Sequence, residues 1–319
     1  MLEYPKFKVC VRCQTFNQMG YIRDALHGFT IQKTDFPFIC CIIDDASTDD
    51  EPFVILNFLD EFFDYPAGPI LCKKETSYAR IIYAQHKINK NCFFAVLLLK
   101  ENHYSKKQLY KVNEYLKEWR YDCRYEAFCE GDDYWVREDK LQKQVNLMDS
   151  DRLYSMCFTG NYRLEQSGTL IENRYLPYSC SECGIEDYIN RKGDSSDTCT
   201  LMLRKDVYDN KPQWRMNSPV GDIPMKLVSF HSGKVGYIND LTGVYRLNAS
   251  SSWSEKMYSN RAFRFSNHKA IVKMWKAFDI WSENKYHASI CRKIVYLKLR
   301  FLKCELHFLL KGIYSLVQE

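Results

Sequence analysis

Residues 38–49 read FICCIIDDASTD, an unbroken apolar run that ends abruptly in acidic and hydroxyl side chains. Apolar residues without alternating polar ones are typical of a strand buried on both faces of a parallel sheet. Residues 92–99 (CFFAVLLL) and 125–129 (YEAFC) have the same character, and the second run is followed by EGDDYW. In such sheets ligands bind at the carboxyl ends of the strands, which is where both acidic clusters fall.

The segments between these runs have helical spacing of their apolar residues. Strands that alternate with helices predict an α/β fold, with a mostly parallel sheet flanked by helices. The expected strands of the first half are 7–13, 38–43, 92–99 and 125–129, and the expected helices are 19–32, one around Phe53–Leu59, 105–120 and 137–150. The second half is more mixed, with expected strands 153–164, 199–204 and 234–247, a helix from Gly221, and C-terminal helices 255–284 and 286–318.

The composition is that of a folded globular protein. Of 319 residues, 46% are hydrophobic, 15% aromatic and 27% charged, which excludes a largely disordered or fibrous chain. The longest strictly apolar run, Cys92 to Leu99, is shorter than the roughly 20 residues that a membrane-spanning helix requires. Because the first residues lack the apolar core of a signal peptide, we expect a cytoplasmic protein.

The cysteines and the charges narrow the class of protein further. Many of the 14 cysteines lie in apolar strand-like runs, where cysteine acts as a small buried hydrophobic residue, so we expect reduced thiols. The pairs Cys10/Cys13 and Cys180/Cys183 together imitate a zinc site, but residues three apart on a strand face opposite sides. The net charge of +5 resides in residues 285–319, with seven Lys or Arg and two Glu. We therefore expect no nucleic-acid partner.

The first acidic cluster follows the strand at 38–43. The Ser47-Thr48-Asp49 segment suits a helix cap, because these side chains satisfy the free N–H groups of a helix start. Such a cap does not need the Asp44–Asp45 pair, however. Carboxylates at this edge of a sheet can accept hydrogen bonds from a base or a ribose, so a structural and a functional interpretation both stand.

The second cluster places Glu130, Asp132 and Asp133 within four residues. Carboxylates this close repel one another, and Mg²⁺ or Mn²⁺ is the common remedy, held by one or two carboxylates together with substrate phosphates. The alternative is an exposed acidic turn. Tyr134 and Trp135 come next, and because these large rings are costly to expose, they favour a partly enclosed metal site.

Together these motifs resemble family 2 glycosyltransferases, which have the nucleotide-sugar-binding GT-A fold. The opening strand ending in Thr15-Phe16-Asn17 matches the Thr-Tyr-Asn element of that family, and residues 44–49 match its Asp-Asp-Gly-Ser-Thr-Asp motif. Glu130 to Asp133 match its Asp-x-Asp motif, and the variant EGDDYW followed by KLQ is typical of a bacterial branch that builds surface polysaccharides. Further matches lie at 102–107, 198–205, 221–224, 233–237 and 245–246.

The resemblance implies a role for each matched residue. The nucleotide of a nucleotide-sugar donor, UDP above all, would contact Thr15, Phe16, Asn17, Asp44, Asp45 and Asp132. Mn²⁺ or Mg²⁺ would be held by Asp132 and Asp133, with Glu130 and Trp135 near the donor or acceptor sugar. Asp222 would deprotonate the acceptor hydroxyl and so bring about direct displacement with inversion. Without the resemblance, Gly221-Asp222 before an apolar helical stretch favours an ordinary helix N-cap.

Three positions depart from the family pattern. Asn248 stands where the family often has a histidine after Tyr-Arg, and we leave it out of the metal site because an amide oxygen is the weaker ligand for borderline metals. Phe16 lacks the hydroxyl of the usual tyrosine. Ala46 replaces glycine and restricts the backbone.

The resemblance covers roughly residues 7–254, which sets the expected domains. Residues 1–254 would form the GT-A domain, with 1–135 as the nucleotide-binding half and 136–254 as the acceptor-side half. Residues 255–319 would form a helical extension. In its last helix, 286–318, a broad apolar arc opposes a basic sector, a pattern that suits peripheral contact with an anionic membrane at the inner face of the plasma membrane. Packing of this helix on the domain or on a partner is the alternative.

The sequence thus predicts an inverting, metal-dependent glycosyltransferase that acts on a glycan or lipid-linked acceptor in bacterial surface polysaccharide synthesis. A sugar-phosphate nucleotidyltransferase is a second candidate class. It normally carries a Gly-rich basic loop after the first strand, whereas this chain has Arg12 to Asn17 (RCQTFN) there. A catalytically inactive glycan-binding scaffold is the third candidate, and the acidic residues at 45, 132, 133 and 222 argue against it.

Overall fold

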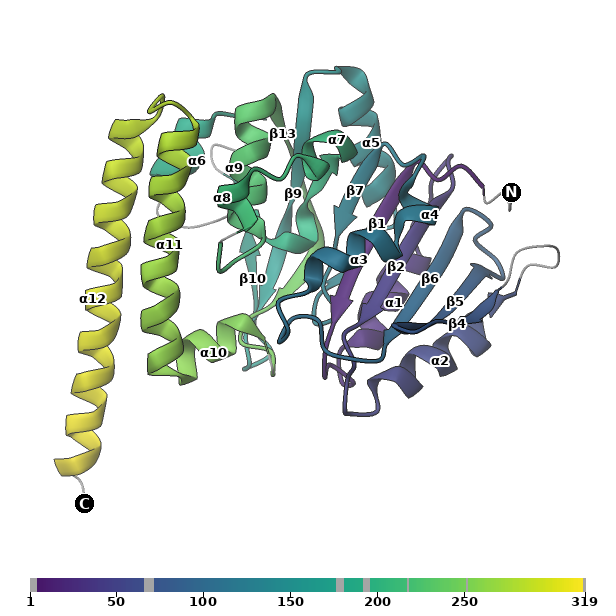
Figure 1. The fold of residues 1–319 in the computed structure, drawn as a ribbon, viewed down its shortest axis with the longest axis horizontal. Helices are drawn as coiled ribbons and strands as arrows, with labels where there is room; N and C mark the ends of the chain where they lie inside the picture. The colour runs from purple at the N-terminus through teal and green to yellow at the C-terminus, as the bar shows by residue number, and fades with distance from the viewer. Residues whose placement is uncertain are drawn as a thin grey trace.

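A computed structural model describes residues 5–65, 72–175, 181–191, 196–216, 218–250 and 252–317. Cys180 lies outside these residues, so the second pair of the zinc alternative does not enter the description. The strands form one mixed sheet that extends from the centre to the right of Figure 1, with order β11-β13-β9-β12-β7-β1-β2-β6-β5-β3. Helices cover both of its faces. This architecture confirms the expected α/β fold.

Four parallel strands form the centre of the sheet, and they are the four strands expected in the first half. Their bounds are β1 Val9–Thr15, β2 Phe38–Asp44, β6 Cys92–Leu99 and β7 Tyr125–Phe128. β1 lies between β2 and β7, and Thr15 pairs with Asp44 across the β1–β2 ladder. Because all four run in the same direction, their carboxyl ends meet at one edge of the sheet.

The outer strands depart most from expectation. The sequence analysis assigned no strand between residues 60 and 91, yet β3 Phe63–Asp64, β4 Lys73–Glu75 and β5 Ala79–His86 lie there as an antiparallel edge. On the other side, the expected strands appear as β9 Tyr154–Leu164, β12 Met202–Arg204 and β13 Lys234–Arg246. The remaining short strands are β8 Tyr134–Trp135, β10 Leu170–Asn173 and β11 Glu182–Cys183.

The helices divide between the two faces. On one face of the sheet pack α1 Ile22–Thr30, α2 Glu51–Phe62 and α5 Lys140–Ser150. On the other face pack α3 Val112–Tyr115, α4 Lys117–Arg120, α9 Asp222–Ser232 and α11 Arg261–Trp281. Shorter helices are α6 Ile185–Asn190, α7 Lys205–Asp209, α8 Gln213–Met216 and α10 Trp253–Ser259.

The helix expected over 105–120 is wrong as a continuous element. Lys107 adopts a positive φ of 57°, which interrupts helical geometry, and the helical turns that follow start only at Leu109. These turns still present Val112, Leu116 and Trp119 to the sheet, where all three are buried. The apolar spacing thus identified the buried face correctly but not the break in the backbone.

The long C-terminal helix α12, His287–Val317, packs along α11 (Figure 1). Glu305 accepts hydrogen bonds from Arg264 at 2.7 Å and Arg261 at 3.0 Å, and the Phe301 ring stacks on His268. This side of α12 therefore packs on the rest of the protein, which was the alternative to membrane contact. No helix among the described residues has an apolar stretch sufficient for crossing a membrane.

We predict that Gly28→Ala destabilises the protein. A Cβ at Gly28 would lie 2.7 Å from the backbone nitrogen of Trp135 and 2.8 Å from its carbonyl oxygen, so α1 would have to move away from β8. Overpacking of this kind lowers the free energy of unfolding by about 1–3 kcal/mol, as urea titration would measure. Gly20→Ala is the matched control, because its Cβ meets nothing within 4 Å. Equal stability of the two variants would contradict the close packing.

Candidate active site

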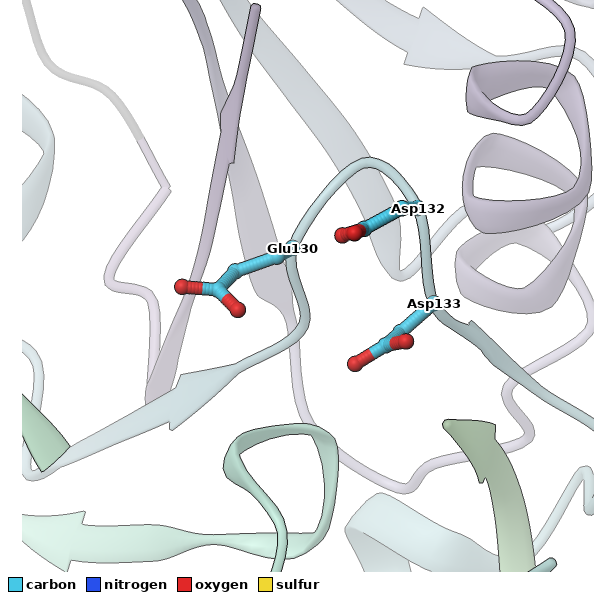
Figure 2. A group of neighbouring side chains, drawn as sticks. All are labelled: Glu130, Asp132 and Asp133. Carbon is cyan, nitrogen blue, oxygen red and sulfur yellow. The ribbon is translucent and has the colours of Figure 1, made fainter. Parts of the chain in front are cut away.

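Three carboxylates follow β7 on a single loop at the carboxyl edge of the sheet. Figure 2 shows Glu130, Asp132 and Asp133 on this loop, and one oxygen from each lies within 4.8 Å of the others. Asp133 is 1% exposed and Asp132 is also buried, whereas Glu130 is open to solvent. Among the described residues this is the group of acidic, cysteine and histidine side chains that could hold a metal ion.

The loop is fixed to the end of β1 by a close approach of the backbone. The Gly131 N–H donates to the Gln14 carbonyl at 3.0 Å. A Cβ at Gly131 would overlap the hydroxyl of Thr15 and come within 2.6 Å of the Gln18 amide oxygen. Only glycine therefore fits between the two flanking acids, which is the physical reason for glycine within this motif.

Arg246, at the end of β13, ties the loop to the rest of the domain. Its backbone N–H donates to Asp133 Oδ1 at 2.9 Å, and its guanidinium donates to the Asp132 carbonyl at 2.6 Å and to the carboxylate of Asp24 on α1. The guanidinium lies between the Tyr21 and Tyr134 rings. The sequence analysis quoted Arg246 as part of a motif but gave it no role.

The electrostatics of the loop favour a bound cation. Asp133 Oδ2 is buried and has no hydrogen-bond partner among the described residues, and burial raises the pKa of this carboxyl, reinforced by Asp132 and Glu130. Although the Glu130 side chain is exposed, its pKa is raised to about 8, first because the surrounding protein limits hydration of the carboxyl group and then by the carboxylates of Asp132 and Asp222. An unpaired buried carboxylate oxygen beside two further carboxylates is the oxygen donor set that Mg²⁺ and Mn²⁺ prefer. The residues present therefore fit the implied metal.

Asp222 is the first residue of α9 and lies near enough to Glu130 for its carboxylate to raise the pKa of that residue. The residue that caps α9 is Gly221, so Asp222 is not the N-cap of this helix. Its Oδ2 accepts a hydrogen bond from Lys226 Nζ, one turn along α9, at 2.9 Å. The Lys226 side chain is fully buried, and the Asp-x-x-x-Lys spacing was a signal that the sequence analysis did not use.

At the end of β2, Asp44 and Asp45 have different surroundings. Asp45 Oδ1 accepts from the backbone N–H of His103 at 2.7 Å, and Oδ2 accepts from that of Tyr104 at 2.9 Å. Asp45 thus holds the loop after β6, while each oxygen keeps a further lone pair for a ligand. Asp44 Oδ1 accepts from the Ser47 N–H, and its buried Oδ2 has no hydrogen-bond partner within the ranges that the structure describes.

A buried glutamate that the sequence analysis missed connects the ends of β1 and β2. Glu51 opens α2 and accepts hydrogen bonds from the Thr15 hydroxyl, the Gln18 N–H and the Ser47 hydroxyl. Asn17 Oδ1 in turn accepts from the Thr48 N–H at 2.8 Å. The Ser47-to-Glu51 spacing of one helical turn could have revealed this contact. These bonds give Thr15 and Asn17 fixed positions at the edge of the sheet.

The remaining candidate residues divide between the site and the core. Phe16 is half-buried at the end of β1, beside Thr15. Trp135 is 2% exposed, packs edge-on against Phe29 of α1, and donates its indole N–H to the Cys199 carbonyl at 2.8 Å. With its ring enclosed and its donor used, Trp135 supports the core, and a sugar contact is not supported by this placement.

Two of the departures from the family pattern also have positions in the structure. Ala46 has φ of 61° and Asn248 has φ of 55°, both in the left-handed region. Glycine adopts this region without steric cost and asparagine tolerates it, but alanine is strained there. The strain expected at Ala46 is therefore present. The backbone carbonyl of Asn248 accepts from the Gln166 side chain at 3.2 Å.

Comparison with solved structures identifies the fold. It is shared with a mannosyltransferase. That enzyme, PcManGT from Pyrobaculum calidifontis, was solved with GDP-Man and Mn²⁺; the TM-score is 0.52 at 12% identity, over 99% of this chain and 81% of that one. Residues 1–349 of S. aureus TarS give a TM-score of 0.51 at 14% identity, over 91% of this chain and 89% of that one. At these identities the likeness establishes the glycosyltransferase-like fold.

Sequence comparison adds distant relatives. The chain is 27% identical over 258 residues to the uncharacterized proteins Rv1520 of Mycobacterium tuberculosis and Mb1547 of Mycobacterium bovis. The alignment covers 78% of this chain and 61% of those proteins, so the chain spans about three fifths of their length. No protein-family profile matches the chain. Evidence for the reaction therefore comes from the residues of the site.

We predict that Asp133→Asn stabilises the metal-free protein and removes its response to Mn²⁺. The substitution removes a buried charge that lacks a partner at Oδ2, which should raise the free energy of unfolding by about 1–3 kcal/mol. Melting curves in EDTA would measure the stabilisation and curves in Mn²⁺ the response to the metal, since an ion that binds the folded state raises the Tm. Asp122→Asn, at an exposed position, is the control. A Mn²⁺ response that survives in Asp133→Asn would contradict the site.

Proposed function

We propose that this chain is an inverting, metal-dependent glycosyltransferase of the family 2 type. The observation that carries the proposal is the group formed by Glu130, Asp132 and Asp133 at the carboxyl edge of the parallel strands, with Asp222 near enough to raise the pKa of Glu130. The three carboxylates would hold a metal and, through it, a diphosphate. Asp222 Oδ1 would accept a proton, since Lys226 donates to Oδ2.

The donor would lie along the edge of β1 and β2. The nucleotide would contact Thr15, Phe16 and Asn17 at the end of β1 and the Asp44–Asp45 pair at the end of β2. Glu130, Asp132 and Asp133 would hold Mn²⁺ or Mg²⁺, which supplies charge to stabilise the departing nucleoside diphosphate. The Mn²⁺ and GDP-Man bound by PcManGT support this assignment, and UDP remains the nucleotide implied by the sequence motifs.

Asp222 would act as the general base. It removes the proton of the acceptor hydroxyl, whose oxygen attacks the anomeric carbon as the bond to the diphosphate breaks on the opposite face. One bond forms and one breaks, the proton ends on the Asp222 carboxyl, and the configuration inverts. The Lys226 ammonium, 2.9 Å from Asp222 Oδ2, holds this carboxylate in one orientation.

We predict that Asp222→Asn abolishes sugar transfer and leaves donor binding intact. Loss of a general base lowers the rate by about 10²–10⁴-fold. Release of nucleoside diphosphate from a panel of UDP-, GDP- and dTDP-sugars would measure the reaction. A nucleotidyltransferase would instead release pyrophosphate from a nucleoside triphosphate and a sugar phosphate. Asp206→Asn, in the first turn of α7, is the matched control. Full activity of Asp222→Asn would remove it as the base.

The outer face of α12 has the pattern of a membrane-surface helix, which would suit a membrane-bound acceptor. Val295, Leu299, Leu302, Leu306 and Leu310 are each more than half exposed, and their spacing of three or four residues places them on one side of the helix. Lys298, Arg300 and Lys303 are exposed around this stripe. Glu305, the acidic residue of α12, is turned inward and paired with Arg264.

These charges favour one occupant for the stripe. Two copies of α12 would bring like charges together, whereas an anionic lipid surface would neutralise them. We therefore propose that α12 lies on the inner face of the plasma membrane and that the acceptor is a glycan or a lipid-linked glycan of a bacterial surface polysaccharide. The division into a nucleotide half, 1–135, an acceptor half, 136–254, and an extension, 255–319, is part of the same proposal.

We predict that the chain sediments with anionic lipid vesicles and that Leu302→Glu weakens this binding by about tenfold or more, because burial of one leucine contributes about 1.5–3 kcal/mol. Binding should fall as salt rises and should be lower for neutral phosphatidylcholine. Leu153→Glu changes a leucine of similar exposure away from α12 and should bind normally. Equal binding of the two variants, or none by the wild type, would contradict the proposal.

A further inference from the structure

Four cationic side chains surround one tyrosine ring on the face of the sheet that carries α9. The guanidinium carbons of Arg12, Arg120 and Arg215 lie 5.2, 5.6 and 5.3 Å from the centre of the Tyr208 ring, and Lys211 Nζ lies 4.8 Å from it. Tyr208 is 8% exposed. We call Arg12, Lys211 and Arg215 the cation triad.

The triad lacks carboxylate partners within the described part of the chain. Arg120 is paired, with Glu126 and with Asp209 at 2.6 Å. By contrast, Arg12 donates to the neutral Asn113 side chain at 2.7 Å, and Arg215 donates to the carbonyls of Tyr208 and Asn210. Lys211 contacts the Tyr208 ring. None of the three has an ion pair within 4.0 Å among the residues described.

Such a gathering of like charges is costly without an anion. Arg12 is 6% exposed, and both Lys211 and Arg215 are half-buried. Buried charges in proteins are normally paired, because desolvation and mutual repulsion oppose the charged form. Consistently, the pKa of Lys211 is lowered to about 8 by burial and by the three nearby arginines, Arg12 first. A ligand with two negative charges would remove this penalty.

The triad adjoins the carboxylate loop. The Tyr208 ring contacts the Phe128 ring at 5.4 Å between centres. Phe128 is the last residue of β7 and precedes Glu130 by two residues, so the Tyr208 ring lies near the start of the carboxylate loop. On the other side, α7, which carries Tyr208, packs against α9, which begins at Asp222. The triad therefore lies between the start of the carboxylate loop and α9, the helix that carries the proposed base Asp222.

We propose that Arg12, Lys211 and Arg215 bind a phosphate group of a substrate. Guanidinium groups present paired donors that match phosphate oxygens, and the lysine adds a point charge. Its position favours a phosphate carried by the acceptor, an assignment that rests on the proposed function. Binding of phosphate itself does not depend on that function, and the donor diphosphate is the other source of the same chemistry.

Inorganic pyrophosphate in EDTA is the probe, with the full chain and Lys211→Gln compared by melting curves and calorimetry. We expect the wild type to gain stability with pyrophosphate and the variant to bind about tenfold more weakly, the equivalent of 1.4 kcal/mol. Without pyrophosphate, the variant should melt at the same temperature as the wild type or higher, because an unpaired cation is gone. Lys117→Gln, an exposed lysine on α4, controls for the loss of one charge.

The outcomes separate the proposal from the proposed function. No binding by the wild type, or equal binding by Lys211→Gln and the wild type, would overturn the phosphate site whether or not sugar transfer is found. If the phosphate site holds, UDP with Mn²⁺ distinguishes the two sources. An unchanged UDP affinity in Lys211→Gln assigns the phosphate to the acceptor, and a tenfold loss assigns it to the donor diphosphate.

Discussion

The site depends on the hydrogen-bonded placement of β1 between β2 and β7. This parallel pairing sets Thr15 opposite Asp44 and Arg12 opposite Phe128, so three strand ends stop at the same edge. The acidic loop then leaves β7 directly beside Thr15, at a distance where no Cβ fits on Gly131. A change of register in either ladder would separate the carboxylates from the end of β1, because side chains alternate faces along a strand.

The same pairing concentrates negative charge that the protein alone does not neutralise. Within the described residues, Asp44 and Asp133 each keep a buried carboxylate oxygen without a hydrogen-bond partner. Arg246 donates its backbone N–H to the Asp133 carboxylate, and its charged guanidinium donates to the backbone carbonyl of Asp132. Buried polar atoms of this kind are rare in proteins and often mark functional sites. The Tyr208 region has the opposite imbalance, with cations in excess. Two regions of opposite unpaired charge on neighbouring parts of one face suit a ligand that is itself charged and metal-bound.

Much of this arrangement could be predicted from the sequence, and the reasons are physical. The unbroken apolar runs of β2 and β6 identify strands buried on both faces, and the acids after β2 and β7 then fall at one edge. The strand β5, ARIIYAQH, was missed because its apolar run of four residues is short and polar residues flank it closely. The enclosure of Trp135 was also missed, since an aromatic residue beside an acidic motif fits a binding surface and a core equally well.

Contacts between distant segments were beyond reach of any local pattern, and α12 shows why. A helical projection places Phe301 and Leu302 on one broad apolar arc, interrupted by Glu305. In the structure that arc divides, because Phe301 stacks on His268 of α11 while Leu302 is exposed. Glu305 is then the inward anchor of the helix, bound to Arg264. Because Glu305 is paired with Arg264 on the inner side, the outer side of α12 combines exposed apolar residues with positive charge.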